Sequence, residues 1–295
     1  MSRIDVIVPC HNSAHCVGRQ LAALGRQRTD DEWGLLIVDD GSTDALAATV
    51  DAHRHHLPAD TRIVTRPVRG GTGAARNTGA RAARGERLLF LDADDEIADD
   101  HIAAMAAALD QAELVTARID YRRLNPPGVL RGTPPDQLCD VLTASLFKPH
   151  VLGGLMGISR GLFDELGGFD ERLPALADVD LSWRAQLAGR AIGVADTVVS
   201  VSVRGTHRGR FRRGRFQGHD IVALRRKFAA HGTTPVTWRA HLADWLRVPV
   251  TAARAGAPAA LSALVWELGW QTGVLGALRS EPPFRPSPLT VPETT

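Results

Sequence analysis

The chain has 295 residues, of which 44% are hydrophobic, 23% charged and 5% aromatic, and its formal net charge is +2. The apolar fraction excludes a disordered chain, and the length is enough for one or two domains with a substantial core. Three scattered cysteines, Cys10, Cys16 and Cys139, exclude a disulfide framework and favour a reducing, cytosolic compartment.

Short apolar runs alternate with helix-like stretches over the first 120 residues. The predicted strands span residues 4–8, 35–38, 63–65, 88–91 and 114–117, and the predicted helices span 14–27, 44–56, 73–84 and 99–109. This alternation predicts an α/β fold with a parallel sheet, in which ligands bind at the carboxyl ends of the strands. The amino terminus has no long apolar stretch, so we expect neither a signal peptide nor a membrane anchor there.

Polar and acidic residues follow the predicted strands. The segments are Pro9-Cys10-His11-Asn12, Asp39-Asp40-Gly41-Ser42-Thr43-Asp44, the glycine-rich run over 70–79, and Asp92-Ala93-Asp94-Asp95. In the second segment we expect Ser42 or Thr43 to cap the next helix. One of the paired aspartates is then expected to accept a hydrogen bond from a base or a ribose, because two buried acids need partners.

Asp92 and Asp94 are candidate ligands for a metal or a nucleotide. Alternate residues beyond a strand end aim two carboxylates at one small volume, and such a pair suits a hard divalent cation that also takes phosphate oxygens and waters. The competing interpretation is that Asp94, Asp95 and Asp99 only cap the following helix.

The segment Gly71-x-Gly73-x-x-Arg76 compares with the dinucleotide fingerprint G-x-G-x-x-G, and Asp92 follows Gly73 by nineteen residues. An NAD(P)-dependent oxidoreductase is therefore an alternative. Against it, Arg76 occupies the third glycine position, and the motif follows the third strand instead of the first. A basic side chain in the same crevice as Asp92 also suits a diphosphate.

After about residue 120 the alternation loosens. Two proline-rich stretches, 125–128 and 133–136, predict a long loop. Further helices are predicted over 178–187, 218–230, 236–254 and 258–278, and the proline-rich tail after Glu281 is predicted to be disordered.

Residues 257–278 are about long enough to span a bilayer. Glu267, Gln271 and three glycines interrupt them, which favours a buried or interfacial helix that can touch a membrane surface.

Six motifs, taken in order across residues 3–210, resemble family 2 glycosyltransferases. They are Val8-Pro9-x-His11-Asn12, Asp39-Asp40-Gly41-Ser42-x-Asp44, Gly71-x-x-x-Ala75-Arg76-Asn77-x-Gly79, Leu91-Asp92-Ala93-Asp94-Asp95, Gly167-Gly168-Phe169-Asp170-Glu171 and Asp178-Val179-Asp180-Leu181-x-x-Arg184. The resemblance implies the GT-A fold, a Rossmann-like, mostly parallel sheet flanked by helices, with a helical C-terminal extension.

The expected organisation has three parts. A GT-A domain covers 1–215, with a nucleotide-sugar half over about 1–120 and an acceptor half over about 121–215. A helical extension covers 216–280, and a disordered tail covers 281–295.

The resemblance also implies roles for single residues. The implied nucleotide-sugar-binding residues are Pro9, Asn12, Asp39, Asp40, Arg76, Asp92 and Ala93. Of these, Asp92 would contact the ribose and Arg76 would steady the donor. Asp94 and His207 would hold a Mn²⁺ or Mg²⁺ ion that bridges the diphosphate of the sugar nucleotide.

Asp178 is the implied catalytic base, with Asp180 as the alternative reactive carboxylate. A hydroxyl is a poor nucleophile at neutral pH, so a carboxylate takes its proton as it attacks the anomeric carbon, with inversion. The family usually has Glu-Asp at this point, whereas this chain has Ala177-Asp178. A non-catalytic sugar-nucleotide-binding relative is therefore a further alternative.

The expected activity is metal-assisted transfer of one sugar from a nucleoside-diphosphate sugar to a glycan, lipid-linked or small-molecule acceptor in bacterial cell-envelope or glycan synthesis. The Q-x-x-R-W motif and the membrane helices of processive synthases are not found. A net charge of +2 gives no case for nucleic-acid binding.

The basic residues include only two lysines, and the run from Arg204 to Arg215 holds six arginines and no acid. The run is expected to meet a diphosphate or an anionic acceptor at a membrane surface, or else to form a solvated loop. The expected location is cytoplasmic, with peripheral contact at the inner face of the plasma membrane.

Overall fold

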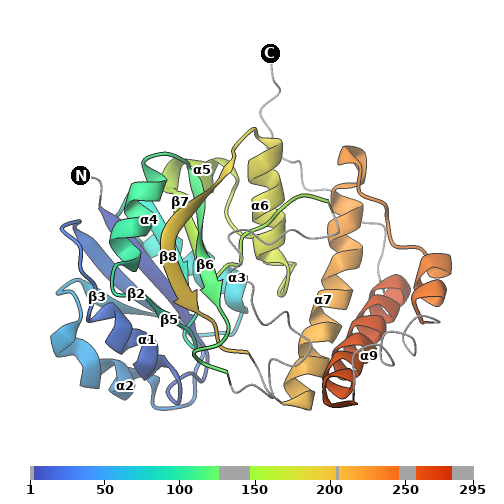
Figure 1. Ribbon diagram of the computed structural model, residues 1–295, viewed down its shortest axis with the longest axis horizontal. Coiled ribbons are helices and arrows are strands. Elements are labelled where there is room, and N and C mark those ends of the chain that lie inside the picture. Colours follow the sequence, from blue (N-terminus) through green and yellow to red (C-terminus); the bar gives the residue numbers. More distant parts are fainter. Residues whose placement is uncertain (1–2, 126–146, 204–205, 246–256, 281–295) are drawn as a thin grey trace.

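One eight-stranded sheet organises the protein in the computed structural model, which describes residues 3–125, 147–203, 206–245 and 257–280. The strand order is β3-β2-β1-β4-β7-β6-β8-β5 (Figure 1). The strands are β1 (Ile4–Cys10), β2 (Trp33–Asp40), β3 (Thr61–Arg66), β4 (Arg87–Leu91), β5 (Glu96–Ile97), β6 (Leu114–Asp120), β7 (Leu155–Ser159) and β8 (Ile192–Ser200). Each of the five predicted strands lies within an observed strand.

The sheet is mostly parallel, as expected. Strands β3, β2, β1 and β4 pair in parallel, and so do β6 and β8. Strand β7 is antiparallel to both β4 and β6, and the short β5 is antiparallel to β8. The near-continuous apolar runs of β1 and β2 follow from their place in the middle of the sheet, where both faces are covered.

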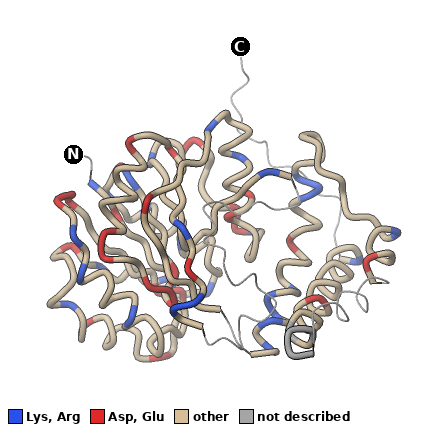
Figure 2. The backbone as a smooth tube through the Cα atoms, in the orientation of Figure 1, with Lys and Arg blue, Asp and Glu red and all other residues tan. Residues whose placement is uncertain are grey.

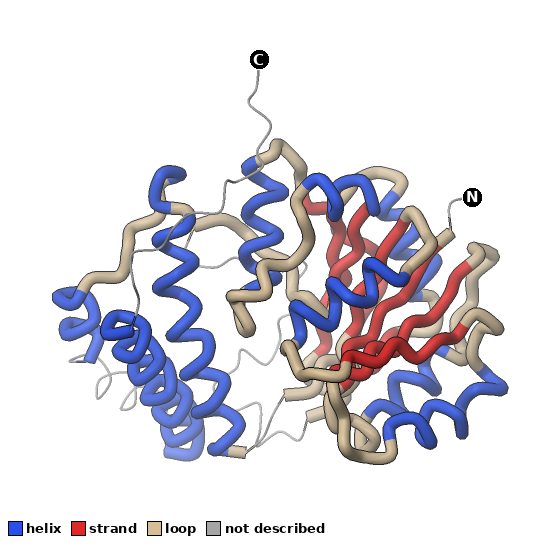
Figure 3. Tube along the Cα trace, turned by 180° about the vertical axis from the view of Figure 1, so that it is seen from behind, coloured by secondary structure: helices blue, strands red, loops and turns tan. Residues whose placement is uncertain are grey.

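Helices cover both faces of the sheet (Figure 3). One core packs α1 (Val17–Leu24), α2 (Leu46–His53) and α4 (His101–Leu109) against one face. The other core packs α3 (Thr72–Ala82), α5 (Arg160–Glu165) and α6 (Ala177–Leu187) against the opposite face. Two 3₁₀ turns, Arg54–His56 and Ala229–His231, follow α2 and α7.

Two long helices, α7 (His207–Lys227) and α9 (Ala257–Ser280), lie side by side, and α6 stands between them and the sheet (Figure 1). The prediction that this region becomes helical only near residue 218 is wrong. The arginine-rich stretch from 207 onward is the first half of α7, because arginine forms helices readily and Thr206 caps the helix by accepting from Gly209 N at 3.1 Å. The expected domain boundary between 215 and 216 therefore falls inside a helix.

Other predictions fall partly outside the described residues. The helix predicted over 236–254 is described as helical over 238–245. Arg204, the predicted loop beyond Asn125 and the predicted tail after Glu281 lie outside the described residues.

The contact between α7 and α9 is made at four glycines, Gly214, Gly218, Gly269 and Gly273. A Cβ at Gly218 would overlap the backbone carbonyl of Trp270, and a Cβ at Gly269 would overlap that of Phe211. The contacts follow the same order along both helices, so the helices are parallel. Glycines four residues apart on both helices allow the backbones to meet directly.

We expect Gly218→Val to lower the free energy of unfolding by about 3 kcal/mol, because the added side chain collides with backbone and α9 must move away. The matched control is Gly161→Ala in α5, where an added Cβ meets nothing within 4 Å. That change should be neutral or raise stability by up to about 1 kcal/mol. Urea unfolding measures both, and equal effects would contradict the close contact of the helices.

Candidate active site

The predicted site segments meet at the switch point of the sheet. The chain runs outward from β1 to β2 and β3, and then returns to β4 on the other side of β1. The segments after β1 and β4 therefore lie next to each other at the carboxyl ends of parallel strands, where ligands of such sheets bind. Basic residues gather along the amino-terminal part of α7 (Figure 2).

Asn12 joins the loops after β1 and β2. It has a left-handed backbone with φ of 52°, and its side-chain Oδ1 accepts from Thr43 N at 2.8 Å. Its own N–H donates to Ser42 Oγ at 3.0 Å. The expected cap by Ser42 or Thr43 is wrong, because α2 begins at Leu46 after Ala45 and no side chain caps it. The two hydroxyl residues hold the loop instead.

The paired aspartates after β2 have different partners. Asp40 is 3% exposed and accepts from Gly70 N at 2.9 Å, from Gly71 N at 2.7 Å and from Arg66 Nε at 2.9 Å. Asp39 is half-buried and accepts from Ser42 N through Oδ1. Asp40 therefore fixes the glycine-rich segment before α3, whereas the second oxygen of Asp39 makes no hydrogen bond within the described residues.

Arg76 of α3 and Asp92 after β4 form an ion pair, so these two side chains lie together, as expected. Arg76 is 6% exposed, and its guanidinium donates to Asp92 Oδ1 at 2.6 Å. The guanidinium also lies 5.5 Å from the ring centroid of Phe169. The Asp92 side chain keeps 40% of its surface exposed. Arg76 thus orients a carboxylate that can still meet a ligand.

Two glycines before β7 connect this pair to Asp178. A Cβ at Gly153 would overlap the Arg76 guanidinium, and one at Gly154 would overlap the Asp92 carboxyl group. Gly153 N also donates to Asp178 Oδ2 at 2.9 Å. Sequence reasoning missed these glycines, although glycine next to a strand often marks a close backbone approach. Asp92, Arg76 and Asp178 are therefore brought together by the Gly153-Gly154 segment.

Asp180 is surrounded by the protein and has a structural role. It is fully buried and paired with Arg184 at 2.6 Å and with Lys227 of α7 at 2.5 Å. Arg184 also donates to the carbonyl oxygens of Leu166 and Gly168. These contacts join α6 to the Gly167-Gly168-Phe169 loop and to α7, and they leave Asp180 no access to an acceptor.

Asp220 of α7 holds the start of α6. Its carboxylate accepts from Ala175 N at 2.7 Å and from Leu176 N at 3.2 Å, directly before the helix. Burial raises the pKa of Asp220 to about 6. The C-terminal helices therefore help to place Asp178, which lies in the first turn of α6.

Ala177 stands where the family usually has glutamate, and its side chain is buried. It is 5% exposed, and its Cβ would lie 3.5 Å from a Cβ placed at Gly73 of α3. The position is thus buried against another helix.

His150 is a further residue near Asp178 that sequence reasoning missed. Burial lowers its pKa, and the negative charge of Asp178 raises it. Its Nδ1 is buried and makes no hydrogen bond within the described residues. The next residue, Val151, is tied to α6 because its N–H donates to Ser182 Oγ at 3.1 Å. No sequence motif marked this histidine.

The acids that follow β4 carry carboxylate groups of the kind that bind a hard cation. Asp95 is buried, and burial followed by the charge of Asp92 raises the pKa of its carboxyl to about 8. Such crowding of carboxylates suits a hard cation. In the part of the chain that the structure describes, no three His, Cys, Asp or Glu side chains form a complete metal site.

The interpretation that these acids cap the next helix is wrong. Helix α4 begins at His101 with Asp100 at the N-cap and no side-chain cap bond, and Asp99 pairs with Arg26 and Arg28. His207, the other implied metal ligand, is the exposed first residue of α7 and makes no hydrogen bond or ion pair with another described residue.

Known proteins resemble this chain in sequence and in fold. Residues 5–167 match the family model described as Glycosyl transferase family 2. The O-antigen biosynthesis protein RfbC of Myxococcus xanthus is 28% identical over 64% of this chain and 15% of its own length. Poly(ribitol-phosphate) beta-N-acetylglucosaminyltransferase TarS of Staphylococcus aureus is 32% identical over 44% of this chain and 22% of its own. The chain thus spans less than a quarter of these two relatives.

A shorter relative matches over more of its length. The PGL/p-HBAD biosynthesis glycosyltransferase of Mycobacterium tuberculosis is 31% identical over 61% of this chain and 68% of its own. Two solved structures share the fold across 95% of the chain. They are the mannosyltransferase PcManGT of Pyrobaculum calidifontis with GDP-Man and Mn²⁺ (22% identity, TM-score 0.65, 88% of that chain) and S. aureus TarS 1-349 with UDP (18%, 0.53, 92%).

Proposed function

The chain belongs to glycosyl transferase family 2, and from this premise we propose that it transfers one sugar from a nucleoside-diphosphate sugar to a hydroxyl group of an acceptor, with inversion. The family and the GT-A fold are as expected, and they replace the alternative of an NAD(P)-dependent oxidoreductase. The observation that carries the proposal is the contact of Gly153 with both Arg76 and Asp178, which brings a donor pocket and a candidate base to one place.

The proposed donor pocket lies at the ends of β1, β2 and β4. Asp39 binds the nucleoside through its remaining oxygen, and Asp92 accepts from the ribose while Arg76 orients it. Pro9 and Ala93 line this pocket. Asp40 and Asn12, also implied as nucleotide-binding residues, act here by holding the loops in place, because their side chains already bond to the protein. Solved relatives that bind UDP, UDP-GlcNAc or GDP-Man support a nucleotide donor of this kind.

The proposed metal ligands are Asp94 and His207, and the donor set suits Mn²⁺ or Mg²⁺. When bound, the cation would offset negative charge on the leaving diphosphate. Support comes from the crowded carboxylates after β4 and from the Mn²⁺ complex of PcManGT.

Asp178 takes the proton of the acceptor hydroxyl as that oxygen attacks the anomeric carbon. The hydrogen bond from Gly153 N fixes the orientation of the carboxylate without occupying all of its lone pairs. The base and the leaving group lie on opposite sides of the sugar in a single displacement, which inverts the anomeric centre. The match to glycosyltransferase relatives argues against the non-catalytic alternative.

We propose a cytoplasmic location with peripheral membrane contact through α7 and α9. Phe211 and Phe216 are 37% and 49% exposed on the arginine-rich half of α7, a combination that suits an anionic interface. No helix within the described ranges is long and apolar enough to cross a membrane. The named activities of RfbC and TarS support a role in bacterial glycan or cell-envelope synthesis.

We also propose the functional division of the chain into a donor half over about 1–120, an acceptor half over about 121–215 and a helical extension over 216–280. Helix α7 belongs to both of the last two parts, and its Asp220 bonds to the start of α6, so the extension is connected to that helix.

We expect Mn²⁺ to strengthen binding of UDP or GDP in a thermal-shift titration, and Asp94→Asn to weaken the apparent Mn²⁺ affinity by about tenfold or more, because a ligand oxygen loses its charge. Asp196→Asn, at a side chain that is 91% exposed, serves as the control and should change nothing. Equal Mn²⁺ affinities for wild type and Asp94→Asn would contradict the assignment.

A further inference from the structure

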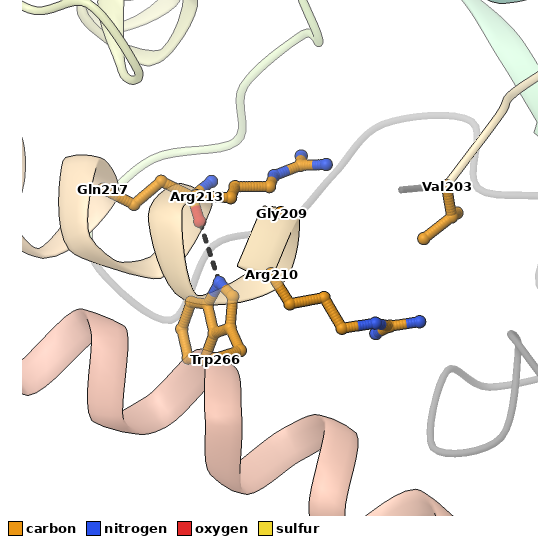
Figure 4. Close-up of a pocket in the computed structure, with 6 residues that line it drawn as sticks. All are labelled: Val203, Gly209, Arg210, Arg213, Gln217 and Trp266. Carbon is orange, nitrogen blue, oxygen red and sulfur yellow. Dashed lines mark hydrogen bonds between the residues drawn. The ribbon is translucent and has the colours of Figure 1, made fainter. Parts of the chain in front are cut away.

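A pocket of about 240 Å³ opens between the first turns of α7 and helix α9 (Figure 4). It is lined by Val203, Gly209, Arg210, Arg213, Gln217 and Trp266. The guanidinium groups of Arg210 and Arg213 extend toward the same side (Figure 4). The indole N–H of Trp266 donates to Gln217 Oε1 at 3.1 Å, so the ring forms a fixed wall.

Of the described residues that line this pocket, two are arginines and none is an acid. No Asp or Glu occurs from Thr206 to His219, and the next acid, Asp220, is buried and bonded to the start of α6. On α9, Glu267 accepts a hydrogen bond from Gln271 of its own helix. Arg213 has no ion pair with any described acid. Arg210 and Arg213 lie one turn apart on α7, so both guanidinium groups can donate to one anion.

The pocket adjoins the proposed donor site without being part of it. Val203 lines the pocket and directly follows Ser202, whose N–H donates to Asp95 Oδ1 at 2.8 Å. Asp95 is the neighbour of the proposed metal ligand Asp94. The pocket is therefore linked through Val203 and Ser202 to the segment that carries the proposed metal ligand.

We propose that Arg210 and Arg213 bind a phosphate group of the acceptor, so that the acceptor class is a phosphate-bearing alcohol. This inference rests on the proposed function, which assigns the donor diphosphate to the acids after β4. Guanidinium groups suit phosphate because their N–H donors match its oxygens. The phosphate belongs either to a water-soluble acceptor or to the headgroup of a lipid.

The test is a titration of glycerol 1-phosphate into protein saturated with Mn²⁺ and UDP or GDP. The double variant Arg210→Gln/Arg213→Gln should weaken phosphate binding at least about tenfold, since it removes charge-assisted hydrogen bonds. Arg212→Gln, at an exposed arginine of the same helix outside the pocket, should leave it unchanged. Unchanged binding in the double variant, or an equal loss in Arg212→Gln, overturns the proposal.

A second arm separates the sources of phosphate. If the phosphate belongs to a lipid, wild type should not bind glycerol 1-phosphate but should co-sediment with phosphatidylcholine vesicles that contain phosphatidic acid, and not with vesicles that lack it. The double variant should then no longer co-sediment with the phosphatidic acid vesicles. Failure of wild type in both arms overturns the proposal.

Nucleotide affinity separates this inference from the proposed function. Unchanged UDP or GDP affinity in the double variant supports a separate acceptor site. Loss of nucleotide binding with unchanged phosphate binding assigns the pocket to the donor and overturns the inference alone. Absence of nucleotide binding in wild type contradicts the proposed function, whereas the phosphate titration can still be read by itself.

Discussion

Asp178→Asn is expected to slow sugar transfer by about two to four orders of magnitude, the contribution of a well-placed general base, while nucleotide affinity stays unchanged. The amide keeps an oxygen that can accept from Gly153 N, so the segment that holds Arg76 and Asp92 should remain in place. Asparagine does not take up the acceptor proton at neutral pH. The effect should therefore appear in kcat and leave donor binding intact.

Initial rates with a nucleoside-diphosphate sugar, together with a separate UDP or GDP titration, measure the two quantities. Asp164→Asn provides a control at an exposed carboxylate of α5 and should keep wild-type rates. Full activity of Asp178→Asn would refute the role of this residue as the base.

Arg184→Met is expected to lower the free energy of unfolding by about 3 kcal/mol or more, because it leaves the fully buried Asp180 with only one cationic partner, Lys227. The change also removes donors from the carbonyl oxygens of Leu166 and Gly168. Methionine fills a similar volume, so lost packing contributes little. The loss comes mainly from buried polar groups without partners.

Urea unfolding followed by circular dichroism measures this loss. Arg81→Met, at an exposed arginine of α3, should alter the unfolding free energy by less than about 0.5 kcal/mol. A loss below about 1 kcal/mol for Arg184→Met would show that the ion pairs contribute no more than surface pairs do.

The strands and the segments that follow them were predictable from local sequence. Apolar runs such as 35–38 fall within buried strands, because a strand covered on both faces has to be apolar along its length. The acids after β2 and β4 were recognised because such charges are costly at buried strand ends unless they have a role. The proximity of Arg76 and Asp92 follows from the same pattern.

Contacts between distant segments were not predictable in this way. Asp39 and Asp40 are adjacent residues of the same type, and only the fold shows that Asp40 is the buried partner of the glycine-rich segment before α3. The approach of Gly153 to Arg76 and Asp178 depends on how β7 pairs with β4. The glycines of α7 and α9 allow close backbone contact, and this role is visible only in the structure, where the two helices lie side by side.

By itself, the sequence determined the α/β class, the family and the chemical character of each strand end, because these depend on periodicity and residue type along short stretches. Only the tertiary structure decided which carboxylates are buried with partners from the protein and which keep exposed surface. The physical reason is that a charged side chain acquires its role from partners up to 107 residues away, as Ser202 and Asp95 illustrate. Those partners satisfy or expose the charge only after the chain has folded.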